Sequence, residues 1–251
     1  MKVSVITAST GNPHLKECIE SVRNQTYKDI EHIVVIDGRS RWDQASPVLY
    51  DATFPRGETS SDQLLVLPYP TGTDRYNGHR IYGAMTFLAS GEFFIFLDDD
   101  NALEPDHIEK LVDLVKKKNL DWAFSFRKII DQESKFICLD DCESLGKWAS
   151  VLNPNDFFVD VNCYFIKKQI AVGMAPVWYR KFREPGQPEI DRVIAGTLMH
   201  PNNKLKFDGT QEYTVKYRVG NTGLSVQADF FKNGNDVMLK RYNGALPWKK
   251  D

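Results

Sequence analysis

The chain has 251 residues, of which 42% are hydrophobic and 26% charged, and its 32 Lys and Arg against 34 Asp and Glu give a net charge of −2. This composition is typical of a globular protein with a buried core, and it argues against a nucleic acid as the main partner. The N-terminal apolar run is too short for a signal peptide, and no stretch reaches the ~18 to 20 apolar residues of a membrane span. We therefore expect a cytoplasmic protein with no integral membrane segment.

Apolar runs and helical periodicity alternate along the first half of the chain. Consecutive apolar residues predict buried parallel strands at residues 3–7, 33–36, 64–67, 93–97 and 122–130. Amphipathic helices are predicted at residues 12–25, 80–89 and 104–118, and the polar segment 39–61, which contains Pro and Gly, predicts a long loop with at most short helices. This alternation predicts a doubly wound α/β sheet, in which ligands bind beyond the carboxyl ends of the strands.

The second half, from about residue 131, is less regular and richer in Trp, Pro and Asn. No linker or internal repeat marks a boundary, so we expect a single domain over residues 1–251. The four cysteines form no CxxC pair, which favours reduced thiols over a zinc site, and Cys18 fits the apolar face of the first predicted helix. Trp248 is expected in a short amphipathic tail that is available to a lipid-linked partner.

Three consecutive acids, Asp98, Asp99 and Asp100, follow the apolar strand predicted at residues 93–97. Their carboxylates repel one another unless a cation or hydrogen-bond donors compensate them. Oxygen ligands of this kind suit Mg²⁺ or Mn²⁺, which often bridge a carboxylate to substrate phosphates. The alternative is a solvated run of acids that caps the next helix. An EF-hand is excluded because Leu103 stands where that loop needs glycine.

Four blocks of the sequence carry a resemblance to a known family. In chain order they are Val3-Ser4-Val5-Ile6, Leu15-x-x-Cys18-Ile19-x-Ser21-Val22-x-x-Gln25-Thr26-Tyr27, Ile33-Val34-Val35-Ile36-Asp37-Gly38-x-Ser40 and Ala89-Ser90-Gly91-Glu92-x-x-x-Phe96-Leu97-Asp98-Asp99-Asp100. Together they resemble the family 2 glycosyltransferases, which have the GT-A fold. The resemblance implies a Rossmann-like, mostly parallel sheet flanked by helices, with a nucleotide-sugar-binding half at residues 1–130 and an irregular acceptor-side half at residues 131–251.

The resemblance also implies an activity and a donor site. The activity is the metal-dependent, inverting transfer of a sugar from a nucleotide diphosphate sugar, with a UDP-sugar as the first expectation and Mn²⁺ or Mg²⁺ as the cofactor. Asp37 matches the acid that recognises the base. Asp98 matches the partner of the ribose or of a metal-bound water, and Asp100 the direct metal ligand. The predicted donor site further includes these four residues: Thr7, Ser9, Arg80 and Asp99.

Asp191 is the predicted catalytic base, because the Asp191-Arg192 pair matches the family's pattern and opens an apolar helical stretch. Its role is to take the proton from the acceptor hydroxyl. Glu189 is the second candidate, and a helix-capping aspartate is the structural alternative.

The remaining site residues are predicted on the acceptor side or at the metal. Asp160 and Asn162 resemble a segment that some family members place near the acceptor, and Trp178 has a ring that stacks on a sugar face unless it belongs to the core. His200 is a candidate for the metal shell, with a surface histidine as the alternative.

Two other functions stay open at this point. One is a non-catalytic nucleotide-sugar or sugar-binding protein on the same fold, which would not need Asp191. The other is a nucleotidyltransferase, which is disfavoured because no basic, glycine-rich loop follows the first strand. The acceptor is left open among a carbohydrate, a lipid-linked group and a protein, and a peripheral contact with the membrane also stays open.

Overall fold

The structure is a computed structural model that describes residues 1–56, 61–73, 76–180, 190–220 and 226–249. The strands are β1 (Val3–Ser9), β2 (Ile30–Ile36), β3 (Asp62–Val66), β4 (Phe93–Phe96), β5 (Ala102–Leu103), β6 (Trp122–Ile130), β7 (Phe136–Leu139), β8 (Tyr164–Lys167) and β9 (Phe207–Arg218). The α-helices are α1 (Leu15–Arg23), α2 (Trp42–Asp51), α3 (His79–Leu88), α4 (His107–Lys118), α5 (Lys168–Trp178), α6 (Ile190–Leu198) and α7 (Ala228–Arg241).

One mixed sheet joins the strands in the order β3-β2-β1-β4-β8-β6-β9-β5, and β7 pairs with β6 at the side. The first four strands in this order are parallel, as the helices between them require. β8 is antiparallel to both β4 and β6, whereas β6 and β9 run parallel to each other. The predicted α/β alternation of the first half is confirmed.

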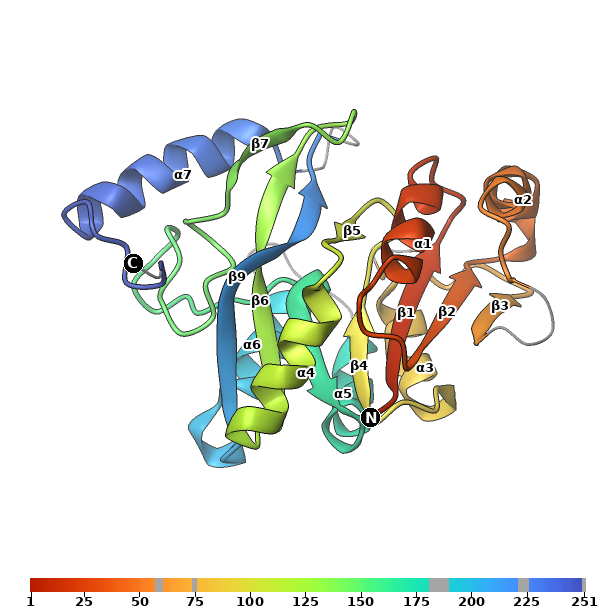
Figure 1. Ribbon diagram of the computed structural model, residues 1–251, viewed down its shortest axis with the longest axis horizontal. Helices are drawn as coiled ribbons and strands as arrows, with labels where there is room; N and C mark the ends of the chain where they lie inside the picture. Colours follow the sequence, from red (N-terminus) through yellow and green to blue (C-terminus); the bar gives the residue numbers. More distant parts are fainter. Residues whose placement is uncertain (57–60, 74–75, 181–189, 221–225, 250–251) are drawn as a thin grey trace.

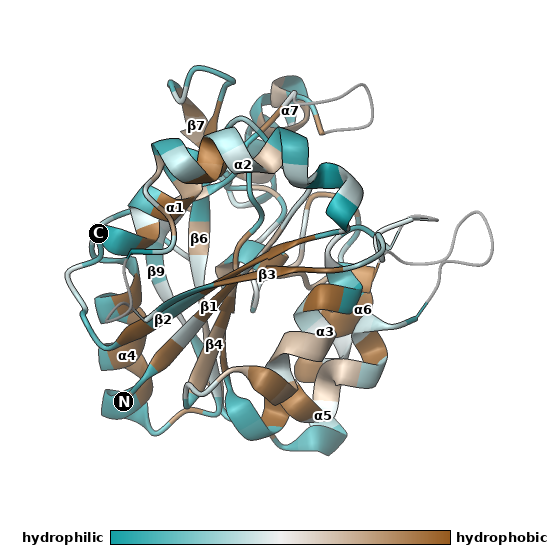
Figure 2. Cartoon of the chain, turned by 90° about the vertical axis from the view of Figure 1, so that its right-hand side faces the viewer, coloured by the Kyte–Doolittle hydropathy of each residue, from teal (hydrophilic) through white to brown (hydrophobic). Residues whose placement is uncertain are grey.

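Helices cover both faces of this sheet (Figure 1). α4 packs on β6 and β9, while α3, α5 and α6 form a continuous layer on the opposite face. Figure 2 shows the apolar strands β1 and β4 between these two layers. All four residues of β4 are buried, which explains its unbroken apolar sequence. In the described parts of the chain, no helix combines the length and the apolar character that a membrane crossing requires.

The segment predicted as a long loop with at most short helices contains the ten-residue helix α2. Pro47 lies inside α2 and removes one helical hydrogen bond, which is why the local pattern argues against a helix. Tertiary packing overrides this cost, because Ala45 and Leu49 are buried against Leu15 and Val34 in a second hydrophobic cluster.

The second half is more regular than predicted. Within the described residues it adds the helices α5, α6 and α7, and its strands β8 and β9 pair with β6 of the first half in the same sheet. Trp248 is fully buried, and its indole N–H donates to Asp141 Oδ1 at 2.9 Å. Trp248 therefore belongs to the core, and the expected amphipathic tail is not formed there.

Candidate active site

The acids predicted from the sequence gather at one edge of the sheet. β1 pairs in parallel with both β2 and β4, so the carboxyl ends of the three strands lie side by side. Asp37 directly follows β2, and its main-chain N–H donates to the Ser9 carbonyl oxygen at the end of β1 at 2.8 Å. Asp98 comes two residues after the end of β4. This edge is where an open parallel sheet binds its ligands.

The Asp98 carboxylate is held by protein donors on both oxygens. The Tyr82 hydroxyl donates to Oδ1 at 2.5 Å, and the Asn162 amide donates to Oδ2 at 2.8 Å. The Asp98 main-chain N–H in turn donates to Asn162 Oδ1 at 2.7 Å. Burial and the neighbouring Asp100 raise the pKa of Asp98 to about 7, although both donors oppose the shift. Protein donors thus fix the Asp98 carboxylate, and a nearby cation would favour its charged form.

Asp99 points toward the loop between β1 and α1. Its Oδ2 accepts from the Thr10 main-chain N–H at 3.3 Å, and the Ser9 hydroxyl also bonds this carboxylate. Burial, together with repulsion from Asp98, raises the pKa of Asp99 to about 6. Ser9 and Asp99 therefore shape the loop beside the acidic turn.

Thr7 does not reach the acidic turn. Its side chain is buried, and its hydroxyl lies 3.0 Å from His32 Nε2 and 3.7 Å from Cys18 Sγ. The Thr7 side chain is thus covered by α1 and does not join the acidic turn.

The acidic turn offers only oxygen ligands, and these fit Mg²⁺ or Mn²⁺. Asp98 and Asp99 are each engaged by protein donors, and Asp100 is half-buried. Within the described residues, no group of three or more His, Cys, Asp or Glu is placed to hold a metal ion. A metal here would take its other ligands from water and substrate phosphates.

His200 is not part of this site. It is exposed, and its Nδ1 accepts from the Asn202 main-chain N–H at 3.3 Å. The chain then enters β9 at Phe207, which pairs with Trp122 at the start of β6. That sheet edge is opposite to the acids, so the structure does not bring His200 to the acidic turn.

Asp37 is 6% exposed and is framed by the segment that follows β3. Its Oδ1 accepts from the Thr71 main-chain N–H at 2.6 Å and from the Thr71 hydroxyl at 2.9 Å, and its Oδ2 accepts from the Gly72 N–H at 2.8 Å. A Cβ on Gly72 would lie 2.8 Å from that same oxygen, so the close approach requires glycine. Of the roughly four lone-pair positions of the carboxylate, donors from the described residues occupy three.

Arg80 is connected to the same segment. It donates to the Thr71 carbonyl oxygen at 3.2 Å, and its guanidinium carbon lies 3.4 Å from the Tyr76 ring centre and 4.9 Å from that of Tyr179. Its Nε is buried and, within the described residues, has no hydrogen-bond partner. The structure thus places Arg80 beside the Asp37 segment, on two aromatic rings.

Asp191 lies in the first turn of α6, where the sequence predicts a helix start. Its side chain is 25% exposed, and its Oδ1 lies 3.3 Å from His79 Nε2 at the start of α3. Buried Ile190 and Ile194 anchor α6. Glu189, the second candidate for the base, lies outside the described residues.

The three residues predicted on the acceptor side, Asp160, Asn162 and Trp178, are buried. Asn162 donates to Asp98 and to Asp160 Oδ1, at 2.8 Å and 2.9 Å, so it bridges two carboxylates. Asp160 is 5% exposed. Trp178 is 1% exposed and packs on Phe96 and Tyr82, with ring centres 5.2 and 5.7 Å away.

The sequence analysis missed Arg127, which organises the second half of the site. Arg127 is 1% exposed in β6 and donates to three carboxylates: those of Asp140, Asp160 and Glu143. Burial raises the pKa of Glu143 and of Asp160, whereas Arg127 outweighs burial at Asp140 and lowers its pKa. The one available signal was a lone arginine inside the apolar run 122–130.

A chain of contacts extends from this arginine to both candidate acids. Asp160 links Arg127 to Asn162 and hence to Asp98. Glu143 links Arg127 to Arg192, which donates to it at 2.6 Å and directly follows Asp191. The acidic turn and the start of α6 therefore share one buried ionic network.

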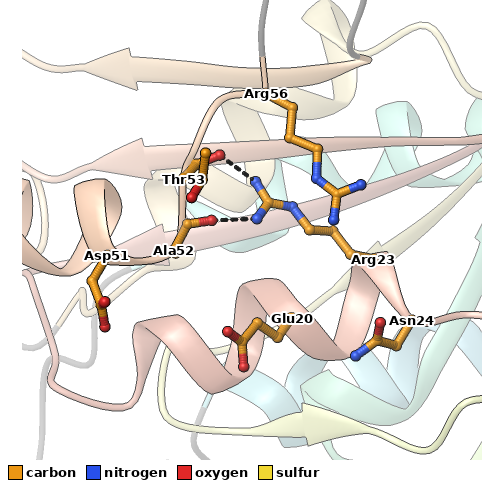
Figure 3. A pocket seen from close by; sticks show the side chains of 7 residues that line it. All are labelled: Glu20, Arg23, Asn24, Asp51, Ala52, Thr53 and Arg56. Carbon is orange, nitrogen blue, oxygen red and sulfur yellow. Dashed lines mark hydrogen bonds between the residues drawn. The ribbon is translucent and has the colours of Figure 1, made fainter.

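A separate pocket of about 470 Å³ lies between the ends of α1 and α2 (Figure 3). Arg23 lines it, but its guanidinium is engaged by the Ala52 and Thr53 carbonyl oxygens and by Asp62. The pocket is at the sheet edge opposite to the acids, so it is not the candidate active site.

Comparison with known proteins links this geometry to a family. A family model described as glycosyl transferase family 2 matches residues 4–174. An uncharacterised glycosyltransferase of Methanocaldococcus jannaschii is 24% identical over 229 residues, which cover 87% of this chain and 71% of that protein. The glucosyl-dolichyl phosphate glucuronosyltransferase of Haloferax volcanii is 25% identical over 237 residues, which cover 82% of this chain and 70% of that protein.

A solved structure supports the fold independently. The mannosyltransferase PcManGT from Pyrobaculum calidifontis, in complex with GDP-Man and Mn²⁺, aligns with a TM-score of 0.59 at 14% identity. The alignment covers 88% of this chain and 58% of that chain. At this identity, the similarity shows a shared GT-A fold.

Proposed function

This chain belongs to glycosyl transferase family 2 and is a glycosyltransferase, and from that premise we propose that it transfers a sugar from a UDP-sugar to an acceptor hydroxyl with inversion. Residues 1–130 bind the donor and residues 131–251 face the acceptor. The observation that carries the proposal is that α3 contacts both Asp98, through Tyr82, and Asp191, through His79, so the proposed donor-site acid and the proposed base both lie against one helix.

The hydrogen bonds of Asp37 favour uracil as the donor base. Two donors from Thr71 occupy Oδ1, and one donor from Gly72 occupies Oδ2, so the carboxylate has room for one further N–H. Uracil offers a single N–H on its pairing edge. Guanine offers two adjacent donors, which would need both oxygens.

Asp100 is the proposed metal ligand, with Mn²⁺ or Mg²⁺ as the cofactor. The metal, when bound, supplies positive charge that stabilises the departing diphosphate. Asp98 stays fixed by Tyr82 and Asn162 and faces the ribose or a metal-bound water. Ser9 and Asp99 hold the loop beside the phosphates, and Arg80 lies beside the base segment.

Asp191 is the proposed catalytic base. It takes the proton from the acceptor hydroxyl while the acceptor oxygen attacks the anomeric carbon on the face opposite to the diphosphate. Inversion follows from this single displacement. His79, at 3.3 Å, orients the Asp191 carboxylate.

A lipid-linked sugar is the first acceptor class to test, since the Haloferax volcanii relative is named a glucosyl-dolichyl phosphate glucuronosyltransferase. Free carbohydrates and proteins are the alternative acceptors.

The experiment measures the release of UDP or GDP and product formation with UDP-glucose, UDP-N-acetylglucosamine and GDP-mannose, each with and without Mn²⁺. The same ligands are tested in thermal-shift assays, because a ligand that binds only the folded state raises the melting temperature. We expect shifts and turnover with a uridine donor, dependent on Mn²⁺. A response to GDP-mannose alone would contradict the assignment of the base.

The role of Asp191 is tested with Asp191→Asn, compared with Glu189→Gln. We expect Asp191→Asn to lower turnover by about 10²- to 10⁴-fold, the usual range for loss of a general base, with an unchanged shift by UDP. If Asp191→Asn keeps wild-type turnover while Glu189→Gln loses most of its turnover, the role of the base belongs to Glu189.

A further inference from the structure

Arg218 is the last residue of β9, and its side chain is fully buried behind the acidic turn. β9 pairs with β6 up to Ile130, so the guanidinium emerges where both strands end. The acidic turn, the start of α1 and the connection between β6 and β7 meet around it.

The Arg218 side chain donates to all three of these segments. Its Nε donates to the Asp100 carbonyl oxygen at 2.9 Å. One terminal nitrogen donates to the Asp131 and Gln132 carbonyl oxygens, and the other donates to the Glu17 carboxylate at 2.5 Å and to the Ser134 hydroxyl at 3.0 Å. Every N–H of the guanidinium is therefore used.

The main chain of Arg218 fixes the next residue of the same turn. Its N–H donates to the side-chain oxygen of Asn101 at 2.8 Å, and Asn101 is 2% exposed. The Asn101 main-chain N–H closes the turn by donating to the Asp98 carbonyl oxygen at 3.1 Å. One residue thus holds Asp100 through its backbone and Asn101 through its side chain.

We propose that Arg218 is a positioning residue that sets the orientation of Asp100 and thereby the affinity of the acidic turn for a divalent metal. This inference rests on the metal site of the proposed function. Arg218 contacts the backbone of Asp100, so it fixes the direction in which the carboxylate leaves the turn.

Lysine cannot reproduce this arrangement. An ammonium group keeps the charge but offers one nitrogen in place of a planar fork that spans three segments. Arg218→Lys therefore separates the geometric role from the charge. Arg23→Lys is the matched control, because Arg23 has an 8% exposed side chain and a similar set of carbonyl and carboxylate acceptors at the opposite sheet edge.

The test is a titration of the full chain with Mn²⁺ in the presence of UDP, in which the paramagnetic resonance signal of free Mn²⁺ reports binding without any turnover. Loss of groups that orient metal ligands typically weakens metal affinity by about 10- to 100-fold, and we expect Arg218→Lys to fall in this range. Arg23→Lys should bind Mn²⁺ as the wild type does. Melting temperatures are measured for both variants.

The outcomes separate the two levels of the proposal. A wild type that binds no Mn²⁺ with UDP would overturn the metal site and this inference with it. The role of Arg218 alone would be overturned if the wild type binds Mn²⁺ and Arg218→Lys binds it with the same affinity. It would also be overturned if Arg23→Lys loses as much Mn²⁺ affinity as Arg218→Lys. If Arg218→Lys does not fold, Glu17→Ala removes a partly exposed partner of the guanidinium and should weaken Mn²⁺ binding by about two- to tenfold, the range for one hydrogen bond. Unchanged affinity in that variant would equally overturn the inference.

Discussion

His79 and Tyr82 lie one helical turn apart on α3, and each contacts a carboxylate from a different part of the chain. His79 Nε2 is 3.3 Å from Asp191 on α6, and the Tyr82 hydroxyl donates at 2.5 Å to Asp98, which follows β4. Residues three apart on a helix share one face. α3 therefore contacts both the proposed donor-site acid and the proposed base, and it helps to fix the distance between them.

Tyr82→Phe removes one of the two groups that hold the Asp98 side chain and leaves the shape of the ring. We expect a loss of about 1–3 kcal/mol in the free energy of unfolding, since a buried acceptor loses a donor. Donor turnover should fall by about 10- to 100-fold, as is typical when the partner of a site carboxylate is lost. Urea unfolding and kcat/KM measure the two effects.

Tyr164→Phe is the control for this variant. The Tyr164 hydroxyl is equally buried and, within the described residues, has no hydrogen-bond partner. Its removal should not lower stability or turnover. Equal effects of the two substitutions would contradict a specific role for the bond between Tyr82 and Asp98.

Local sequence pattern was sufficient for the five strands β1, β2, β3, β4 and β6 and for the place of the acids, but not for β5, β7, β8 and β9. The run 93–97 predicts β4 because a strand covered on both faces needs apolar residues at every position. In α4, Ile108, Leu111 and Val115 repeat at helical spacing, and all three are buried. Asp37 and Asp98 could be placed at one edge because the strands before them are parallel.

Contacts between distant segments could not be predicted in this way. Arg127 and Asp160 are 33 positions apart, and Arg218 and Glu17 are 201 positions apart. No local periodicity specifies which carboxylate a buried arginine meets. Trp178 shows the same limit, because whether its ring faces a sugar or the core depends on how α5 packs on α3.

Arg127→Met tests whether the buried network depends on its central cation. It leaves Asp140, Asp160 and Glu143 without their shared partner, and we expect a loss of about 3–5 kcal/mol in unfolding free energy. Arg192→Met is the comparison, since Arg192 is 20% exposed and pairs with two carboxylates. Because Arg192 is less desolvated than Arg127, we expect Arg192→Met to lose less unfolding free energy. A larger loss for Arg192→Met would show that the network centres on α6 instead.

Trp248→Ala tests whether the end of the described chain belongs to the core. Trp248 is fully buried, and removing a buried aromatic side chain costs about 3–5 kcal/mol. Lys249→Ala is the control, because its partly exposed ion pair with Asp141 contributes only ~0–1 kcal/mol. Urea unfolding of both variants measures the difference. Equal stabilities would mean that this segment adds nothing to the fold.

His107 predicts a pH dependence that a single substitution isolates. Burial lowers its pKa to about 3, whereas the unfolded chain titrates near ~6.5. As the pH falls below that value, the unfolded state binds a proton that the folded state does not, so the contribution of His107 to stability is lost. His107→Asn should be less stable than the wild type at pH 7, and the gap should narrow by about 2 kcal/mol at pH 5. Urea unfolding at both pH values measures the gap. His200→Asn, at an exposed site, is the matched control, and an equal narrowing there would contradict the assignment to the buried histidine.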